Sequence, residues 1–413
     1  MPKRILAFQP WDGGSHRAVR RAIERHAGHE WTFRTMPGRG PRWRLRLAGL
    51  AFATEERRRS RVGESPEADA VFATGMLSLS DLRATLPPRL RDRPHVLYMH
   101  ENQIAYPASP RTRTRDRERD THLAFTNLAS IEAADRIIWN SAWNRGSFID
   151  GMEELLAHAP EPIDPGWRER LERRSVVIPP PIERLEPSPA REPARAGIPG
   201  TDDSEHAVIL HNTRLADYPD AIRIVWPHRW EHDKGCDELL EIIGEARRRE
   251  TAGGPRLHWL LLGQPVQRIP ESMRTLLEAH ADRIEHAGRL PRAEYVRTLR
   301  RADWVLSTAR HEFYGIAVAE ALLAGCLPWL PDRLSYPELV PAAALGLDPW
   351  NTDFRTVDPG GHGVNRAELD RMIAERLERA DATVAVPKLE SVISDAIEDA
   401  EAQARCRAEG RRD

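Results

Sequence analysis

Two series of short apolar runs, each ending in polar residues, constrain this chain more than any other feature of its sequence. The first series lies at 3–8, 68–74, 95–102, 134–141 and 175–182. The second begins at 221 and continues at 256–265, 283–290, 302–313 and 326–332. Helical patterns such as "SHRAVRRAIERHA" separate the runs. This alternation predicts an α/β protein with parallel sheets, whose functional loops follow the carboxyl ends of the strands.

A stretch without periodicity separates the two series. Residues 186–207, "EPSPAREPARAGIPGTDDSEHA", are rich in proline, alanine, glycine and charge, which is typical of a linker or an exposed insertion. We therefore expect a Rossmann-like domain at 1–185, a linker or insertion at 186–220, a second Rossmann-like domain at 221–388 and a terminal helix at 389–413.

The composition is that of a globular protein. The 413 residues are 40% hydrophobic and 30% charged, and no run of about 18 uncharged apolar residues predicts a membrane span. The N-terminal apolar run is too short for a signal peptide. The three cysteines lie far apart, so neither a disulfide framework nor a metal site is indicated, and we expect a cytoplasmic protein without stable membrane insertion.

Charge is distributed unevenly. Residues 1–150 hold 26 arginines and lysines against 17 acids, whereas the whole chain has a net charge of −2. The positive residues cluster at 39–49, 57–61 and 111–119. Two interpretations remain open: a solvated arginine-rich surface, or a face that follows the phosphates of a polyanion.

The segment "HEFYGIAVAEALLAG" places Glu312 and Glu320 eight positions apart in an apolar stretch. We expect a helix from Phe313 to its C-terminal Gly325, with Glu312 just before its N-terminus and Glu320 two turns further along. The helix N-terminus offers unpaired N–H groups that suit a phosphate, and Gly315 would let a ligand approach the backbone. Carboxylates accept hydrogen bonds from sugar hydroxyls, so a sugar–diphosphate–ribose chain fits this arrangement. The alternative is a buried helix with two boundary acids.

A second motif, "WPHRWEHDKG" at 226–235, follows a predicted strand. Arg229 and Lys234 lie five apart on its loop, where two cations can converge on a diphosphate. The alternative is a pair of surface cations, but Lys234 is one of only three lysines in the chain. No Asp-x-Asp pair is present, so a metal clamp is not predicted and the cations would stabilise a leaving diphosphate.

The N-terminal half also ends several strands in polar residues. "WDGGSH" contains a glycine pair, "YMHENQIAYP" a polar cluster and "WNSAWN" a further amide and hydroxyl. His100, in the second motif, could contact a donor sugar or help deprotonate an acceptor. The alternative is a loop histidine whose hydrogen bonds are all made within the fold. The residues concerned are Gly13, Gly14, His100, Glu101, Asn102, Gln103, Asn140 and Ser141.

The pattern "EFYGIAVAE" followed by "ALLAGCLP" resembles the Glu-x7-Glu motif of retaining glycosyltransferases with the GT-B fold, in the family 4-like group. That resemblance implies two Rossmann-like domains with parallel sheets facing across a cleft. It also implies that Glu312 contacts the donor sugar, that Glu320 holds the nucleotide ribose, and that Arg229 and Lys234 neutralise the departing nucleotide. The remaining donor-site residues implied are Gly13, Gly14, Phe313, Tyr314 and Gly315.

Four motifs together, "GGSH", "HENQ.AYP", "WNSAWN" and "HRWEHDKG", resemble the glycosyltransferase-like domain-containing group, which includes tRNA-queuosine mannosyltransferases. The resemblance spans about residues 3–345 and implies transfer of mannose from GDP-mannose to queuosine in the tRNA(Asp) anticodon. The sequence departs from the group at "WPHRW", where an Asn more usually precedes the Arg, and in the 186–207 insertion. The implied acceptor-binding residues are His100, Glu101, Asn102, Gln103, Asn140, Ser141 and the arginines Arg113, Arg115 and Arg117.

Two other functions stay open at this point. "PRWRLRLAGLAF" at 41–52 could form an amphipathic helix that places the enzyme on a membrane surface, with a lipid-linked or envelope acceptor. A non-catalytic RNA- or protein-binding module on the same scaffold would be signalled by loss of Glu312, Glu320 or Lys234, and all three are present.

Overall fold

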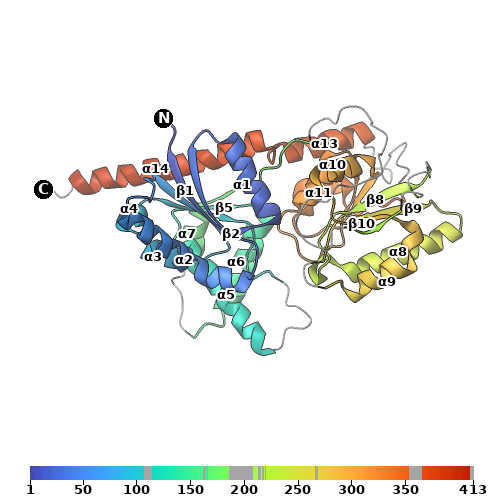
Figure 1. Ribbon diagram of the computed structural model, residues 1–413, viewed down its shortest axis with the longest axis horizontal. Helices are drawn as coiled ribbons and strands as arrows, with labels where there is room; N and C mark the ends of the chain where they lie inside the picture. The colour runs from blue at the N-terminus through green and yellow to red at the C-terminus, as the bar shows by residue number, and fades with distance from the viewer. Residues whose placement is uncertain are drawn as a thin grey trace. The chain divides into compact units, whose positions relative to one another are not determined.

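The computed structural model of this chain forms two α/β units (Figure 1). Unit 1 comprises residues 1–183 and 378–413, and unit 2 comprises residues 184–377. The structure describes residues 1–106, 114–160, 164, 166–185, 208–212, 215, 218, 220–265, 268–352 and 365–409, without the side chains of 114–120, 208–209 and 409.

Unit 1 is built on a six-stranded parallel sheet with the strand order β2-β1-β3-β4-β5-β6. The inner strands are almost wholly buried, as expected for apolar runs covered by helices on both faces. The strands are β1 (Arg4–Asp12), β2 (Glu30–Pro37), β3 (Ala70–Thr74), β4 (His95–Met99), β5 (Arg136–Trp139) and β6 (Ser175–Val177).

The helices of unit 1 follow these strands and cover the sheet. One core joins apolar side chains of the sheet to those of the helices, with Phe8, Trp139 and Phe148 among its largest members. The helices are α1 (Gly14–His26), α2 (Pro41–Arg61), α3 (Leu79–Thr85), α4 (Pro88–Arg91), α5 (Thr114–Glu132), α6 (Ala142–Leu156), α7 (Trp167–Arg173) and α14 (Ala382–Glu409).

Unit 2 has a second six-stranded sheet with the order β12-β11-β8-β9-β10-β7. Its strands pair in parallel except β7, which is antiparallel to β10. The strands are β7 (Val208–His211), β8 (Ile222–Trp226), β9 (Leu257–Leu261), β10 (Ile284–Gly288), β11 (Trp304–Leu306) and β12 (Leu327–Trp329). The helices are η2 (His232–Lys234), α8 (Cys236–Thr251), α9 (Glu271–Ala279), η3 (Ala281–Arg283), α10 (Arg292–Arg301), α11 (Ile316–Leu323), α12 (Tyr336–Leu339), η4 (Ala342–Ala344) and α13 (Arg366–Glu378).

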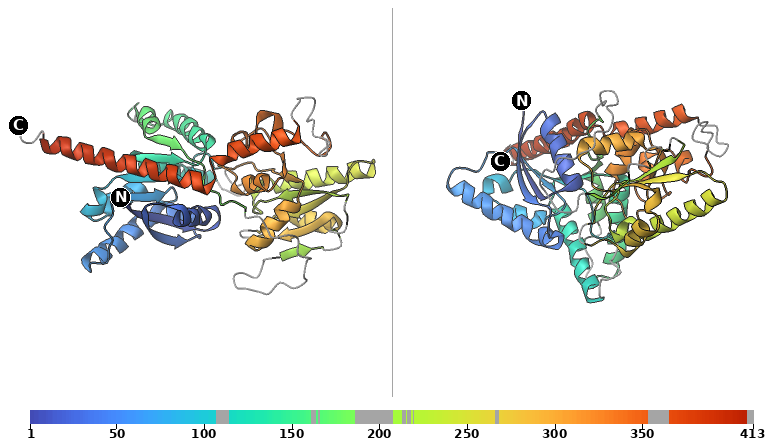
Figure 2. Two further views of the ribbon diagram at one scale, coloured as in Figure 1. Left: turned by 90° about the horizontal axis from the view of Figure 1, so that it is seen from above. Right: turned by 45° about the vertical axis from the view of Figure 1, so that its right-hand side comes forward.

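The C-terminal helix begins earlier than expected and belongs to unit 1. α14 starts at Ala382 rather than at 389, and it packs against α1, β4 and β5 (Figures 1 and 2). Glu390 anchors it by accepting hydrogen bonds from the backbone N–H groups of Gly28 and His29, at 2.9 and 2.8 Å, and from the indole of Trp31 at 3.0 Å. A sequence window cannot show such contacts, because they join residues about 360 positions apart.

Two strands were not expected from the sequence. β2 is an edge strand whose residues are all exposed or only partly buried, and its sequence has no continuous apolar run. β7 lies inside the expected linker at 186–220, where four residues form the antiparallel edge beside β10. The expected insertion at 186–207 itself lies outside the described residues.

Candidate functional site

In unit 2, the loops after β8 and β11 bring the predicted donor residues together. The loop after β8 runs from 227 into η2 and ends at Gly235, whose φ of +68° is left-handed. A Cβ at Gly235 would stand 2.1 Å from the carbonyl oxygen of Thr308, which follows β11. A glycine is therefore required here by both conformation and space, and it holds the two loops in contact.

Lys234 is the centre of a buried ionic cluster between these loops. Its Nζ donates to the His311 carbonyl oxygen at 2.7 Å and lies 3.3 Å from Glu312 Oε2 and 3.2 Å from Asp233 Oδ2. The side chains of Lys234 and Asp233 are 8% and 2% exposed, and that of Glu312 is 22% exposed. The structure thus places two of the predicted residues, Lys234 and Glu312, in direct contact.

The cluster shifts the ionisation of its members. Burial alone would raise the pKa of Glu312, but the neighbouring Lys234 ammonium outweighs it and holds the pKa at about 2. Burial would lower the pKa of Lys234, yet Glu312 and Asp233 raise it above its usual value. Both groups are therefore charged at neutral pH.

Two histidines border this cluster. Burial and the nearby Lys234 lower the pKa of both His228 and His311 to about 4, so both rings are neutral at pH 7. The ring of His228 is oriented by Ser307 Oγ, 2.8 Å from its Nε2. Arg229, by contrast, is 54% exposed, and its guanidinium lies 3.3 Å from Glu231.

The helix that carries Glu320 is shorter than expected. α11 begins at Ile316, and the predicted start at Phe313 is wrong because Gly315 adopts a left-handed φ of +89° and caps the helix. Glu320 therefore lies about one turn inside the helix and not two. The helix ends before Gly325, which adopts a φ of +99°, as predicted.

The residues just before α11 contribute backbone rather than exposed side chains. Phe313 and Tyr314 are 6% and 2% exposed, and the ring of Phe313 packs edge-on against His311 at 4.4 Å. A ligand at this end of α11 would therefore meet the main chain of 313–315 and the carboxylate of Glu312. Ala319 N already bonds to the Gly315 carbonyl, as in a regular first turn.

Glu320 is engaged by α10. Arg292 Nη1 lies 2.7 Å from its Oε1, and the hydroxyl of Tyr295 donates a second hydrogen bond. Burial raises the pKa of Glu320, although Arg292 and Tyr295 partly offset this effect. Any ligand hydroxyl that binds Glu320 has to share this carboxylate with Arg292.

In unit 1, His100 follows β4 and is packed among aromatic rings. Its ring centroid lies 4.0 Å from that of His16, in α1, and 4.5 Å from that of Tyr98. Burial, followed by the proximity of His16, lowers the pKa of His100 well below its usual value. His100 is 7% exposed and neutral at pH 7.

The amide and hydroxyl side chains near His100 are used within the fold. Asn140 Nδ2 donates to the His100 carbonyl at 2.7 Å, and Asn144 Nδ2 donates to Asn140 Oδ1 at 2.8 Å. Asn102 Nδ2 donates to Asn144 Oδ1 at 2.9 Å, and Ser141 Oγ caps α6 by accepting from Asn144 N at 2.9 Å. Asn102, Asn140 and Ser141 are all buried, so they fix the loop that carries His100.

The predicted glycines and the remaining polar residues after β4 lie at the same sheet edge. Gly13 and Gly14 connect β1 to α1, and Gly14 has a left-handed φ of +51°. Glu101 and Gln103 are partly exposed and share a hydrogen bond of 3.3 Å. Arg113 and the side chains of Arg115 and Arg117 lie outside the described residues.

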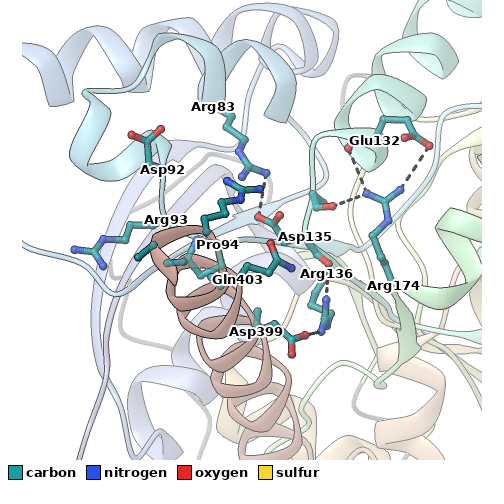
Figure 3. Close-up of a pocket in the computed structure, with 16 residues that line it drawn as sticks. Arg83, Asp92, Arg93, Pro94, Glu132, Asp135, Arg136, Arg174, Asp399 and Gln403 are labelled. Carbon is teal, nitrogen blue, oxygen red and sulfur yellow. Dashed lines mark hydrogen bonds and ion pairs between the residues drawn. The ribbon is translucent and has the colours of Figure 1, made fainter. Parts of the chain in front are cut away.

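A pocket of about 700 Å³ lies at the opposite edge of this sheet, beside the amino ends of β4 and β5 and against α14 (Figure 3). Arg83 Nη1 is 3.0 Å from Asp135 Oδ2, Arg136 pairs with Asp399, and Arg174 donates to a main-chain carbonyl at 2.7 Å. These arginines attach α14 and neighbouring loops to the sheet. The pocket is thus distinct from the edge that holds His100.

Several site residues were missed from the sequence. Asp233 and His228 lie inside the quoted "WPHRWEHDKG" motif, and His16 inside "GGSH", so the motifs contained them without revealing their contacts. No sequence pattern near Arg292 indicated a role, because it meets Glu320 only through the packing of α10 on α11.

Over the part of the chain that the structure describes, no group of three His, Cys, Asp or Glu residues is arranged to hold a metal ion. No helix in that same part is long and apolar enough to cross a membrane.

Comparison with solved structures defines the class of fold. The N-terminal domain of Candida albicans trehalose-6-phosphate phosphatase has a TM-score of 0.64 at 12% identity, over 96% of this chain and 97% of that one. A UDP-forming trehalose-phosphate synthase from Burkholderia xenovorans gives 0.59 at 14% identity, over 95% of this chain and all of the other. With Rossmann-like sheets in both units, the chain has the GT-B fold of glycosyltransferases, as predicted.

Sequence comparison gives the family. A family model for the N-terminal part of tRNA-queuosine alpha-mannosyltransferase matches residues 4–182. The tRNA-queuosine alpha-mannosyltransferase of Drosophila melanogaster is 31% identical over 342 residues, which are 83% of this chain and 82% of that protein. The chain belongs to the tRNA-queuosine alpha-mannosyltransferase family, which confirms the resemblance drawn from its motifs.

Proposed function

We propose that this chain is a retaining, metal-independent mannosyltransferase that moves mannose from GDP-mannose to queuosine in the anticodon of tRNA(Asp). The observation that carries the proposal is the buried Lys234–Glu312–Asp233 cluster at the carboxyl ends of the unit 2 strands. Family membership supports the acceptor, since a relative is named for tRNA queuosine. The free thiols of Cys236, Cys326 and Cys406 suit a reducing cytoplasm.

In this proposal unit 2 binds the donor. As the bond from mannose C1 to the diphosphate oxygen breaks, negative charge grows on the departing diphosphate. Lys234 presents a fixed, buried ammonium, and the exposed Arg229 can turn toward the phosphates without a large desolvation cost. Glu312 would accept a hydrogen bond from a mannose hydroxyl, and Glu320 from a ribose hydroxyl.

Unit 1 binds the acceptor. A hydroxyl of the queuosine cyclopentene diol forms the new bond to mannose C1 and must lose its proton. His100 is neutral at pH 7, the form that can accept a hydrogen bond from this hydroxyl. Asn102, Asn140 and Ser141 act through the loop that they fix, whereas Glu101 and Gln103 have partly exposed side chains that can reach the acceptor.

The test incubates the protein with queuosine-containing tRNA and either GDP-mannose or UDP-glucose, with and without EDTA, and then measures nucleoside masses. A hexose added to queuosine from GDP-mannose alone, in EDTA as well as in buffer, supports the proposal. Transfer from UDP-glucose would refute the assignment of the donor. Loss of activity in EDTA that manganese restores would refute metal independence.

A further inference from the structure

Helix α2 carries an exposed apolar stripe that the proposed chemistry leaves unused. Trp43, Leu47 and Leu50 are 72%, 45% and 39% exposed. They stand at positions i, i+4 and i+7, so they share one face of the helix. Large apolar side chains that gather on one face commonly mark a binding surface.

The opposite face of α2 is firmly packed. Leu45, Ala48 and Phe52 are buried, and a Cβ at Gly49 would stand 2.4 Å from the Ser78 carbonyl oxygen. The helix therefore lies in close backbone contact with the start of α3. Its orientation is fixed, so the apolar stripe does not result from loose packing.

The stripe lies in a strongly basic segment. Residues 31–54 contain five arginines and no acid. Arg44 is held by the end of β2, with Nη2 3.3 Å from the Pro37 carbonyl oxygen. Arg39, Arg42 and Arg46 are exposed beside the stripe, and Arg46 also donates from Nη1 to Thr126 Oγ1 at 2.7 Å. We call Arg39, Arg42, Trp43, Arg46, Leu47 and Leu50 the α2 face. An aromatic ring among cations and without acids is complementary to a nucleic acid.

The α2 face begins at the sheet edge that holds His100. Gly38, in the loop before α2, lies against Gly13, since a Cβ on Gly13 would be 3.6 Å from the Gly38 Cα. In the same loop, a Cβ on Gly40 would be 3.8 Å from the Trp43 ring. Gly13 also precedes the helix whose His16 packs against His100. The chain of contacts from His100 to Trp43 is thus continuous within unit 1.

We propose that the α2 face binds the single-stranded anticodon loop of the acceptor RNA. Trp43 would stack on an unpaired base, and Arg39 and Arg42 would contact the adjacent phosphates. This inference rests on the proposed function and names the surface that positions its acceptor. A membrane on the α2 face would lie over the same sheet edge and obstruct the acceptor, and a second copy would bring two acid-free basic segments together.

The test compares Trp43→Ala with Trp43→Phe and with Val62→Ala, a matched loss of an exposed apolar side chain (58% exposed) just beyond the other end of α2. Anisotropy measures binding of labelled tRNA, and steady-state kinetics give KM and kcat. Loss of one stacked base should weaken tRNA binding about 5- to 150-fold in Trp43→Ala. Trp43→Phe should retain most of the affinity, and Val62→Ala all of it. Donor hydrolysis and kcat at saturating tRNA should stay unchanged.

A companion variant tests the charge. Arg39→Gln with Arg42→Gln should flatten the dependence of tRNA affinity on salt by about 0.7 to 0.9 per lost phosphate contact. Unchanged tRNA affinity in Trp43→Ala would overturn the inference. If the substitution left tRNA affinity unaffected but abolished binding to phosphatidylserine vesicles, the α2 face would be a membrane surface and the inference would be wrong. If it instead abolished a dimer seen in sedimentation, the α2 face would be a contact between two copies. A failure of the proposed function would give a different result from a failure of this inference. Wild type would then bind tRNA in a way that depends on Trp43, but it would not glycosylate the tRNA.

Discussion

Replacing Lys234 by methionine should destabilise unit 2 by about 3–5 kcal/mol at pH 7, the usual cost of removing one partner from a buried ion pair. Methionine retains the length and much of the volume of the lysine side chain. It leaves two carboxylates, Asp233 and Glu312, without the ammonium that now lies 3.2 and 3.3 Å from them.

The pKa of Glu312 gives an independent measure of how much the ion cluster stabilises the folded protein. Its fall from 4.5 to about 2 corresponds to roughly 3 kcal/mol at about 1.36 kcal/mol per pKa unit. Since the pKa is lower in the folded protein, this stabilisation is complete above the unfolded value of 4.5 and is lost as the pH falls toward 2. The difference between wild type and Lys234→Met should therefore shrink by at least about 1.4 kcal/mol between pH 6 and pH 3.5, because burial without the ammonium raises the pKa of Glu312 in the variant.

Urea unfolding of the full chain at several pH values measures this difference. The fluorescence of buried tryptophans, among them Trp226 and Trp304 in unit 2 and Trp139 in unit 1, follows unfolding, and the part of the transition that belongs to unit 2 should move. Lys388→Met, at an exposed lysine of α14, is the matched control and should change stability by less than about 0.5 kcal/mol. An unfolding free energy of Lys234→Met equal to wild type at pH 7, or a difference independent of pH, would refute the reasoning.

Three other substitutions test the site. Donor affinity should weaken as the pH falls toward the raised pKa of Glu320, because protonation removes the negative charge and turns one acceptor oxygen into a hydroxyl; calorimetry on Glu320→Gln should show a weaker but pH-independent affinity. Arg229→Ala should lower kcat more than it raises the donor Kd, since diphosphate charge is largest in the transition state, and equal losses in single-turnover and binding assays would contradict this role. Gly235→Ala should destabilise the protein by more than about 3 kcal/mol, because alanine is strained at this φ and its Cβ would clash with Thr308. Gly253→Ala, at a φ of +94° with open space around it, should cost only about 1–2 kcal/mol in the same urea unfolding experiment.

The sequence predicted those parts of the fold that depend on local pattern. Buried parallel strands are continuous apolar runs, so β3, β4 and β9 were evident. β2 and β7 escaped because edge strands are only partly buried and lack that signature. The attachment of α14 to unit 1 also escaped, since it depends on contacts such as Glu390 with Gly28 that no local window contains.

The sequence identified many residues of the candidate site, but it did not show which of them contact one another. Motif spacing identified Lys234 and Glu312, yet only the folded loops after β8 and β11 show that Lys234 pairs with both Glu312 and Asp233. The polar residues after β4 and β5 were expected to face the acceptor. The structure shows that Asn102 and Asn140 are buried in an amide network, because buried polar groups must be paired within the fold.

The two glutamates of the motif have opposite electrostatic surroundings, and this difference bears on their proposed roles. Glu312 faces a buried cation that fixes its charge, so its carboxylate stays ionised while a sugar binds and leaves. Glu320 is held by a half-exposed arginine and a tyrosine, and its pKa is raised. A constantly charged group suits the reacting sugar, where charge develops during the reaction and protonation would reduce turnover. A carboxylate whose partner, Arg292, can move into solvent suits the ribose, because it can exchange one hydrogen-bond partner for another each time the nucleotide enters and leaves.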